Sequence, residues 1–131
     1  MIAVLDTNVL VSALWTPSGK AAYIVNQVIT GKLNPCHDYR IMAEYREVLM
    51  RPKFKFKKWQ VDALLEVIEK DGNSVIPTPL LEVQFIDETD RVFYEVAKYC
   101  KAPLVTGNLK HYPQDESIKT VAEYYSQILE L

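Results

Sequence analysis

The sequence predicts an α/β fold with three α/β/α layers around a central parallel sheet of about four to five strands. Short apolar segments of strand length alternate with longer segments whose apolar residues recur at helical spacing. The first short segment, residues 2–5, is apolar at every position, which is typical of a strand covered by helices on both faces. Alternating strands and helices favour parallel pairing.

The expected elements follow in order along the chain. Strands are expected at residues 2–5, 33–36, 74–77, 104–106 and 118–121. Helices are expected at residues 7–14, 21–29, 39–50, 59–70 and 91–100. A last helix should begin after Thr120, which forms a capping-box pattern with Glu123. In a sheet of this kind ligands bind outside the carboxyl ends of the strands, near a reversal of strand order.

Composition narrows the class of protein. The 131 residues are treated as one domain, 1–131, and a hydrophobic content of 49% excludes a disordered chain. No apolar run approaches the roughly 20 residues that cross a bilayer, and the start lacks the basic segment of a signal peptide, so we expect a cytoplasmic protein. The net charge of −2 does not by itself indicate nucleic-acid binding. Cys36 and Cys100 form no CxxC pair and are predicted to be packing residues.

Carboxylates occur where such a sheet could gather them. Asp6 directly follows the first strand, although an aspartate there can equally cap the next helix. Glu44 lies on the apolar face of its helix, three residues after Ile41. A carboxylate on an apolar face needs a partner or a cation. The alternative for Glu44 is a buried salt bridge to Arg40 or Arg46.

Two more aspartates, Asp87 and Asp90, precede the helix at residues 91–100. Carboxylates favour a helix N-terminus, so capping is the alternative to a functional role for at least one of them. We assign Asp90 to the site because it lies three residues before the inward-facing Phe93.

Thr106 and Asn108 come at the end of the strand at residues 104–106, and Gly107 between them permits a sharp turn. For this tripeptide alone an ordinary turn is the simpler interpretation. Oxygen ligands without a His or Cys cluster suit Mg²⁺ or Mn²⁺. Such ions activate water and stabilise charge on a phosphodiester, so the combined pattern favours a metal-dependent nuclease.

The segment from Arg51 to Trp59 contains five basic and three aromatic residues. Cations interleaved with rings suit backbone phosphates and unpaired bases, so we assign Lys53 and Lys55 to substrate binding. The alternative is a solvated loop whose rings pack on the core. His111 fits no metal motif but lies near the predicted active edge, where it could contact substrate.

In this order the segments resemble the PIN-domain family. The resemblance rests on Val4–Ala13, on Ala43–Leu49 with Arg51–Phe54, on Asp87–Asp90 with Phe93–Ala97, and on Leu104–Pro113. It spans nearly the whole chain. The sequence is most similar to the small prokaryotic members described as toxin components of toxin–antitoxin systems.

The resemblance implies a parallel sheet flanked by helices and a Mg²⁺- or Mn²⁺-dependent endoribonuclease. The family's acidic residues fall on Asp6, Glu44 and Asp90, and Asp87 is a further candidate metal ligand. The family pattern commonly has another Asp after the Thr-Gly turn, where this chain has Asn108. An amide can orient water but adds no negative charge, which weakens the case for a second metal ion.

The expected reaction is hydrolysis of an RNA phosphodiester, with the carboxylates holding the cation directly or through waters. Thr106 and Asn108 would position the attacking water or a phosphate oxygen. Thr7 and Asn8, next to Asp6, are also assigned to substrate binding.

Several alternatives stay open. A haloacid-dehalogenase-like phosphatase requires a second Asp where this chain has Asn8, and a response-regulator receiver requires an acidic pair at its first strand. A catalytically weak or inactive module of the same fold, binding RNA or protein, is the main alternative to the enzyme. The expected partners are RNA, an antitoxin protein and a second copy of the chain. Tyr23, Tyr124 and Tyr125 are predicted to lie either on a dimer surface or in the core.

Overall fold

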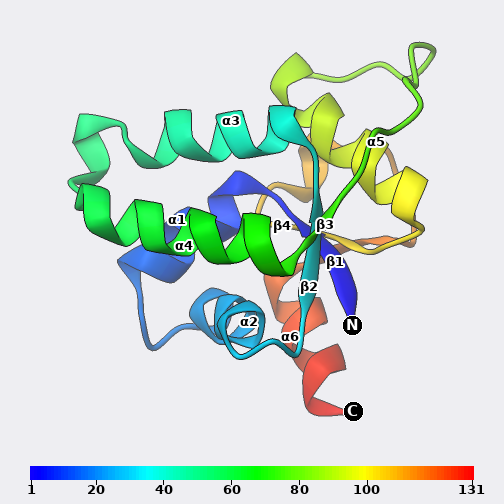
Figure 1. The fold of residues 1–131 in the computed structure, drawn as a ribbon. Helices are drawn as coiled ribbons and strands as arrows, with labels where there is room; N and C mark the ends of the chain where they lie inside the picture. Colours follow the sequence, from blue (N-terminus) through cyan, green and yellow to red (C-terminus); the bar gives the residue numbers. More distant parts are fainter.

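The computed structural model describes all 131 residues and contains a five-stranded, fully parallel sheet with helices on both faces (Figure 1). The strands are β1 (Ile2–Leu5), β2 (Asn34–His37), β3 (Asn73–Ser74), β4 (Leu104–Thr106) and β5 (Ile118–Thr120), in the spatial order β3-β2-β1-β4-β5. The predicted α/β fold with a central parallel sheet is confirmed.

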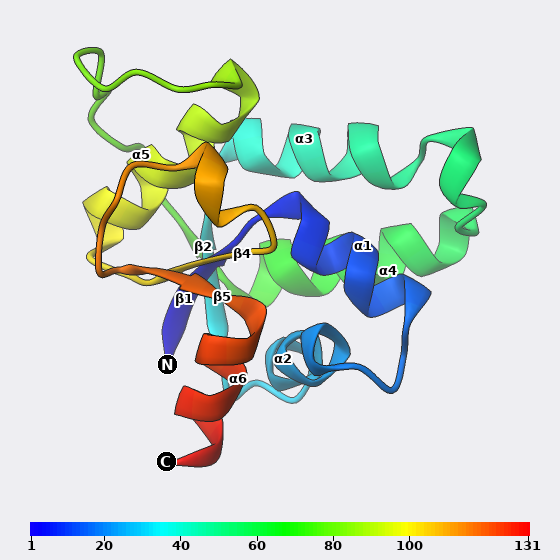
Figure 2. The same cartoon turned by 180° about the vertical axis from the view of Figure 1, so that it is seen from behind.

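Helices connect and cover the strands. They are α1 (Thr7–Trp15), α2 (Lys20–Ile29), α3 (Tyr39–Leu49), α4 (Lys58–Asp71), α5 (Arg91–Cys100) and α6 (Val121–Leu129). Because parallel crossovers are right-handed, connections that run in opposite directions across the sheet place their helices on opposite faces. Accordingly α5 lies on one face and α1, α2 and α4 on the other, where α6 packs against α2 (Figures 1 and 2).

The chain reverses its direction across the sheet between β1 and β4. From β1 it proceeds outward to β2 and β3, then returns to β4 on the other side of β1. Val4 pairs with Leu104 and Leu5 with Val105, so the carboxyl ends of β1 and β4 emerge side by side. This is the position at which open α/β sheets bind ligands.

Strand β1 is the centre of the core. Ala3, Val4 and Leu5 are completely buried because helices cover both faces of the sheet, which explains the apolar run in the sequence. The buried Tyr45 of α3 donates a hydrogen bond from its hydroxyl to the carbonyl oxygen of Leu5 at 2.5 Å. This bond fixes α3 against the carboxyl end of β1.

Some element boundaries differ from those expected. Strand β2 is shifted by one residue, and β3 has two residues where four were expected. The chain leaves the sheet early because Pro77 has no N–H to continue the ladder, and Val75 makes the last backbone bond, to His37, at 2.9 Å. The capping box of Thr120 and Glu123 is confirmed.

Two smaller expectations can be compared with the structure directly. Cys36 is buried and Cys100 half-buried, and neither belongs to a disulfide. No helix is both long and apolar enough to span a bilayer.

A long segment between β3 and α5 is fastened at Leu80. The buried carboxylate of Glu95 accepts a hydrogen bond from the N–H of Leu80 at 2.7 Å and a second from Arg40 at 2.9 Å. From the other side, Arg91 donates to the carbonyl oxygens of Leu80 and Val83. The segment that leads to the aspartates before α5 is therefore anchored by charged hydrogen bonds.

Candidate active site

Asp6 is held in one orientation at the junction of β1 and β4. Its Oδ1 accepts a hydrogen bond from the N–H of Thr7 at 2.8 Å, so it caps α1. Its Oδ2 accepts from the Thr106 hydroxyl (2.8 Å), the Tyr112 hydroxyl (3.0 Å) and the Asn8 amide (3.2 Å). The residue is only 5% exposed. Oδ2 is saturated with donors, whereas Oδ1 retains capacity to bind a further group.

The neighbours assigned to substrate binding from sequence instead support Asp6. Thr106 is fully buried, and its hydroxyl also accepts a hydrogen bond from the N–H of Asn108 at 2.9 Å. Asn8 donates to Asp6 and accepts from the N–H of Gly107 at 2.8 Å, so it joins the ends of β1 and β4. Thr7 is buried, and its hydroxyl has no partner. Thr106 therefore orients Asp6, and the assignment of Thr7, Asn8 and Thr106 to substrate binding stays a prediction.

The two aspartates before α5 have different environments. Asp87 is exposed and caps the 3₁₀ turn before the helix, because its Oδ1 accepts from the N–H (3.0 Å) and hydroxyl (2.8 Å) of Thr89. Asp90 is half-buried and caps nothing, and its Oδ2 lies 3.2 Å from Nδ1 of His111. Burial, followed by the charges of Asp6 and Asp87, raises the pKa of Asp90 to about 6.

Glu44 is half-buried on α3, with no hydrogen-bonding or ion-pair partner. The alternative of a salt bridge to Arg40 or Arg46 is wrong, since both arginines bind other carboxylates. Burial, then the charge of Glu47, raises the pKa of Glu44, and the charge of Asp6 adds to the effect. Glu44 is thus a carboxylate that faces other carboxylates without a neutralising partner.

The charge of Asp6 acts on both Glu44 and Asp90. Burial raises the pKa of Asp6 even though its four hydrogen bonds oppose the rise, and the charge of Asp6 raises the pKa of both others. Unneutralised, partly desolvated carboxylates are costly, and a divalent cation between them would relieve that cost. The donor set therefore suits a hard cation such as Mg²⁺ or Mn²⁺.

The carboxylates do not form a closed cage. No group of three or more Asp, Glu, His or Cys side chains stands close enough to enclose a metal ion. Mg²⁺ usually keeps several waters and is bound by one or two carboxylates together with substrate phosphates. The site therefore fits an open, water-rich cation position that substrate would complete.

Asn108 begins the 3₁₀ turn over Leu109–His111, and its exposed side chain makes no capping hydrogen bond. The turn places His111 next to Asp90 and the hydroxyl of Tyr112 next to Asp6. Sequence reasoning missed Tyr112 altogether, because nothing in its periodicity marks it. Its place shortly after β4 was the only available signal.

Lys53 and Lys55 lie on the far side of α1 and α3 from the carboxylates. Trp15, the last residue of α1, contacts the ring of Phe54 at a centroid distance of 5.4 Å. Asp6 caps the other end of this nine-residue helix, which spans about 14 Å at 1.5 Å per residue. The structure therefore places the two lysines at the end of α1 that is distant from Asp6.

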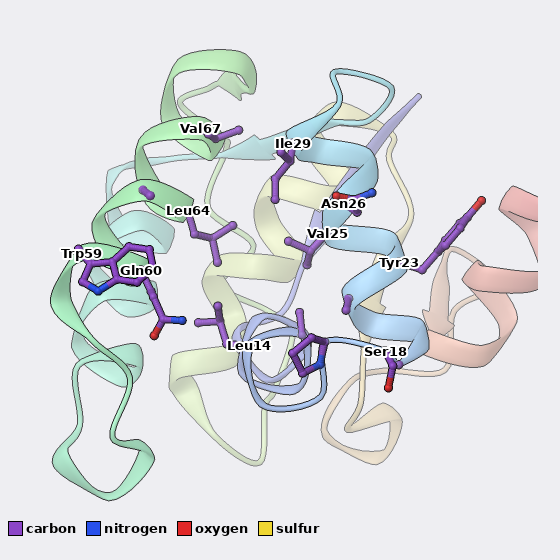
Figure 3. Close-up of a pocket in the computed structure, with 15 residues that line it drawn as sticks. Leu14, Ser18, Tyr23, Val25, Asn26, Ile29, Trp59, Gln60, Leu64 and Val67 are labelled. Atoms are coloured by element: carbon purple, nitrogen blue, oxygen red, sulfur yellow. The ribbon is translucent and has the colours of Figure 1, made fainter.

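An apolar groove of 710 Å³ lies between α1, α2 and α4 (Figure 3). Leu14, Val25 and Leu64 point into it, and Trp59 lies at its edge. The groove is lined by none of the side chains of Asp6, Glu44, Asp90 and Asn108. It is a surface separate from the carboxylate site.

Comparison with known proteins gives one match. A family model described as the PIN domain matches residues 3–110. No curated protein and no solved structure matches the chain. The matched segment includes Asp6, Glu44, Asp90 and Asn108 and ends before Tyr112.

Replacing Glu44 separates a structural role from a functional one. Because the pKa of Glu44 is raised in the folded state, its ionised form opposes folding. We expect Glu44→Gln to raise the free energy of unfolding of metal-free protein by about 0.5 kcal/mol at pH 7, after allowance for solvent screening. This gain in the free energy of unfolding should vanish at a pH below the usual pKa of glutamate, because Glu44 is then protonated in both the folded and the unfolded protein. Chemical denaturation at pH 7 and pH 3 measures the difference between the variant and the wild type, and destabilisation by Glu44→Gln at pH 7 would contradict the expectation.

Replacing Tyr112 by Phe removes one donor to Asp6 and keeps the ring. Since the Tyr112 hydrogen bond lowers the pKa of Asp6, Tyr112→Phe should raise that pKa and weaken Mn²⁺ binding about tenfold. Carboxyl NMR titration and calorimetry measure the two effects. Tyr94→Phe is the matched control, because Tyr94 packs on the same Phe85 ring but donates to Asp115. Equal changes in the pKa of Asp6 and in Mn²⁺ affinity in the two variants would refute the role of Tyr112 as a donor that supports Asp6.

Proposed function

This chain belongs to the PIN-domain family, a family of nucleases that generally use divalent metals, and on that premise we propose that it is a Mg²⁺- or Mn²⁺-dependent endoribonuclease. The observation that carries the proposal is the pair of half-buried carboxylates, Glu44 on α3 and Asp90 before α5, whose pKa values the charge of the buried Asp6 raises, and of which Glu44 has no hydrogen-bonding or ion-pair partner. Carboxylates that only stabilise a fold are normally paired.

Asp6, Glu44 and Asp90 would hold the cation, directly or through waters, and Asp87 would add negative charge nearby. When bound, the cation would polarise the scissile phosphate and lower the pKa of the attacking water. Asp6 would bind through Oδ1, because its Oδ2 already accepts three hydrogen bonds. The exposed amide of Asn108 would orient the water or a phosphate oxygen.

The charge of the site supports one tightly held ion rather than two. The family's further Asp is replaced by Asn108, so three carboxylates remain beside the open position. Affinity for hard cations depends on the number of charged ligands. A second ion would depend on substrate phosphate for its ligands.

We further propose that the protein is a toxin component that a protein antitoxin inhibits. The support is the apolar groove between α1, α2 and α4 (Figure 3), where Ile29 and Trp59 are among the exposed large apolar side chains. Apolar surface of this kind marks protein interaction sites. Binding there would leave the carboxylates uncovered, so inhibition would require an additional segment of the partner.

We also propose self-association into a dimer. Tyr124 is buried and therefore cannot contribute to a dimer surface. Tyr23 of α2 is exposed and Tyr125 of α6 is half-buried, and their rings pack edge to face at 5.1 Å, so the face shared by α2 and α6 offers aromatic surface for such a contact. Sedimentation analysis of the wild type would test this directly.

The alternative of a weak or inactive binding module rests on Asn108. Cleavage assays on Asp6→Asn distinguish such a binding module from the enzyme, because the amide keeps the shape of Asp6 but removes its charge. We expect Mg²⁺-dependent cleavage of RNA to fall by more than about 100-fold, since losing even a partner of a metal ligand costs 10–100-fold. Asp62→Asn is the control, because that carboxylate binds Arg46 and Lys58 away from the site. Cleavage that survives Asp6→Asn would refute the mechanism.

Restoring the family's carboxylate tests the role of Asn108. Since its side chain makes no capping bond, Asn108→Asp adds charge without removing a contact. We expect Mn²⁺ to bind about tenfold more tightly, with a second equivalent appearing, because ligand charge sets affinity. Paramagnetic resonance titration counts the bound ions. Unchanged affinity and stoichiometry would show that position 108 does not face the cation.

A further inference from the structure

Three aromatic rings form a cluster where α1 and α3 end. The rings of Phe54 and Phe56 are stacked, with centroids 5.6 Å apart and planes 10° from parallel. Trp15 stands edge to face with both, at 5.4 Å and 6.1 Å. Trp15 is nevertheless 59% exposed, so much of its indole is open to solvent.

The backbone between the two phenylalanines explains their stacking. Lys55 has φ 57° and ψ 25°, the left-handed conformation that glycine adopts most readily. A left-handed residue turns the chain so that the side chains before and after it lie on the same side. A lysine at this position is uncommon, and such outliers occur preferentially where function requires them.

The cluster carries positive charge that the protein does not neutralise. Lys53, Lys55 and Lys57 are exposed and form no salt bridge, whereas the neighbouring Arg51 and Lys58 do. The Nζ of Lys53 lies 5.0 Å from the Phe54 ring centroid. Phe54 and Phe56 are half-buried, and Phe56 packs against the core, so the two phenylalanines support the exposed indole of Trp15. An exposed ring beside unpaired cations suits a ligand that has flat faces and negative charge.

The cluster also lies at a defined distance from the carboxylate site. Figure 2 shows α1 and α3 running away from the sheet on the same side, with the turn after α3 beyond them. Asp6 caps α1 and Trp15 ends it, a span of about 14 Å. At the 3.4 Å spacing of stacked bases this corresponds to about four nucleotides.

We propose that Trp15, Phe54 and Phe56, with the unpaired lysines around them, form a stacking platform for unpaired RNA bases a few nucleotides from the bond cleaved at Asp6. The inference rests on the proposed ribonuclease function and adds a substrate requirement to it. Bases inside a duplex do not expose their faces, so the platform selects single-stranded RNA. Because the cations and rings are interleaved, an RNA strand fits this surface better than an apolar protein partner does.

The two tryptophans of the chain allow a direct test. Trp59, the other tryptophan, is 68% exposed but lies on the groove rather than in the ring cluster. Trp59→Phe leaves Trp15 as the only indole, and Trp15→Phe leaves Trp59. An unstructured RNA of about 12 nucleotides, added in chelator to prevent cleavage, should quench fluorescence in Trp59→Phe but not in Trp15→Phe.

Affinity measurements provide a second readout. Trp15→Ala should weaken binding of the same RNA about tenfold, with Trp59→Ala unchanged, because base stacking on one ring contributes about that much. Lys55→Gly keeps the left-handed backbone and removes one charge. The number of counterions released on RNA binding, measured from the slope of log affinity against log salt concentration, should therefore fall by about one. Binding of a duplex of equal length should not respond to Trp15→Ala.

The outcomes separate this inference from the proposed function. Absence of quenching in Trp59→Phe, in a protein that still cleaves RNA through Asp6, would overturn the platform alone. Quenching without any Asp6-dependent cleavage would support the platform and remove the ribonuclease. If Trp15→Ala abolished self-association and left RNA affinity unchanged, the cluster would be a protein interface and the proposal would be wrong.

Discussion

The burial of one carboxylate, that of Asp6, organises the centre of this structure. A carboxylate removed from water must receive hydrogen bonds, and the donors to Asp6 come from separate parts of the chain. Thr7 and Asn8 belong to α1, Thr106 ends β4, and Tyr112 follows the next turn. The same bonds that make burial tolerable also fix the end of β1 against the end of β4. The side chain of Asp6 thus reinforces the backbone pairing of β1 with β4 and places a carboxylate at the point where the strand order reverses.

Two glutamates on helices show how a structural carboxylate differs from a functional one. Glu95 is 2% exposed, but Arg40 and the N–H of Leu80 satisfy it, so it anchors the segment before α5. Glu44 is less buried and has no hydrogen-bonding or ion-pair partner, and the charge of Arg51 offsets only part of the rise in its pKa. The first adds stability within the chain. The raised pKa of Glu44 means that its ionised form opposes folding, and the cation that we propose for the site would offset that cost.

The parallel sheet, most helices and the strand-end position of Asp6 could be predicted from the sequence, because they depend on local periodicity. Sequence reasoning also identified Glu44 as a carboxylate on a helix that packs inward. It missed Tyr112 and the structural role of Glu95, because these depend on contacts between residues far apart in the chain. It placed the end of β3 too late, although Pro77 marks that end, and it did not predict that Thr106 donates to Asp6, because that contact joins residues far apart in the chain.

The turn that begins at Asn108 gives the site its individual character. Where the family pattern supplies another carboxylate, this chain supplies an amide, followed by His111 beside Asp90 and Tyr112 on Asp6. A fourth carboxylate would add repulsion that only a second cation could balance. Hydrogen-bond donors have the opposite effect, because they favour the ionised form of the carboxylates that remain. The turn therefore exchanges negative charge for fixed donors, which supports the proposal of a single ion rather than two.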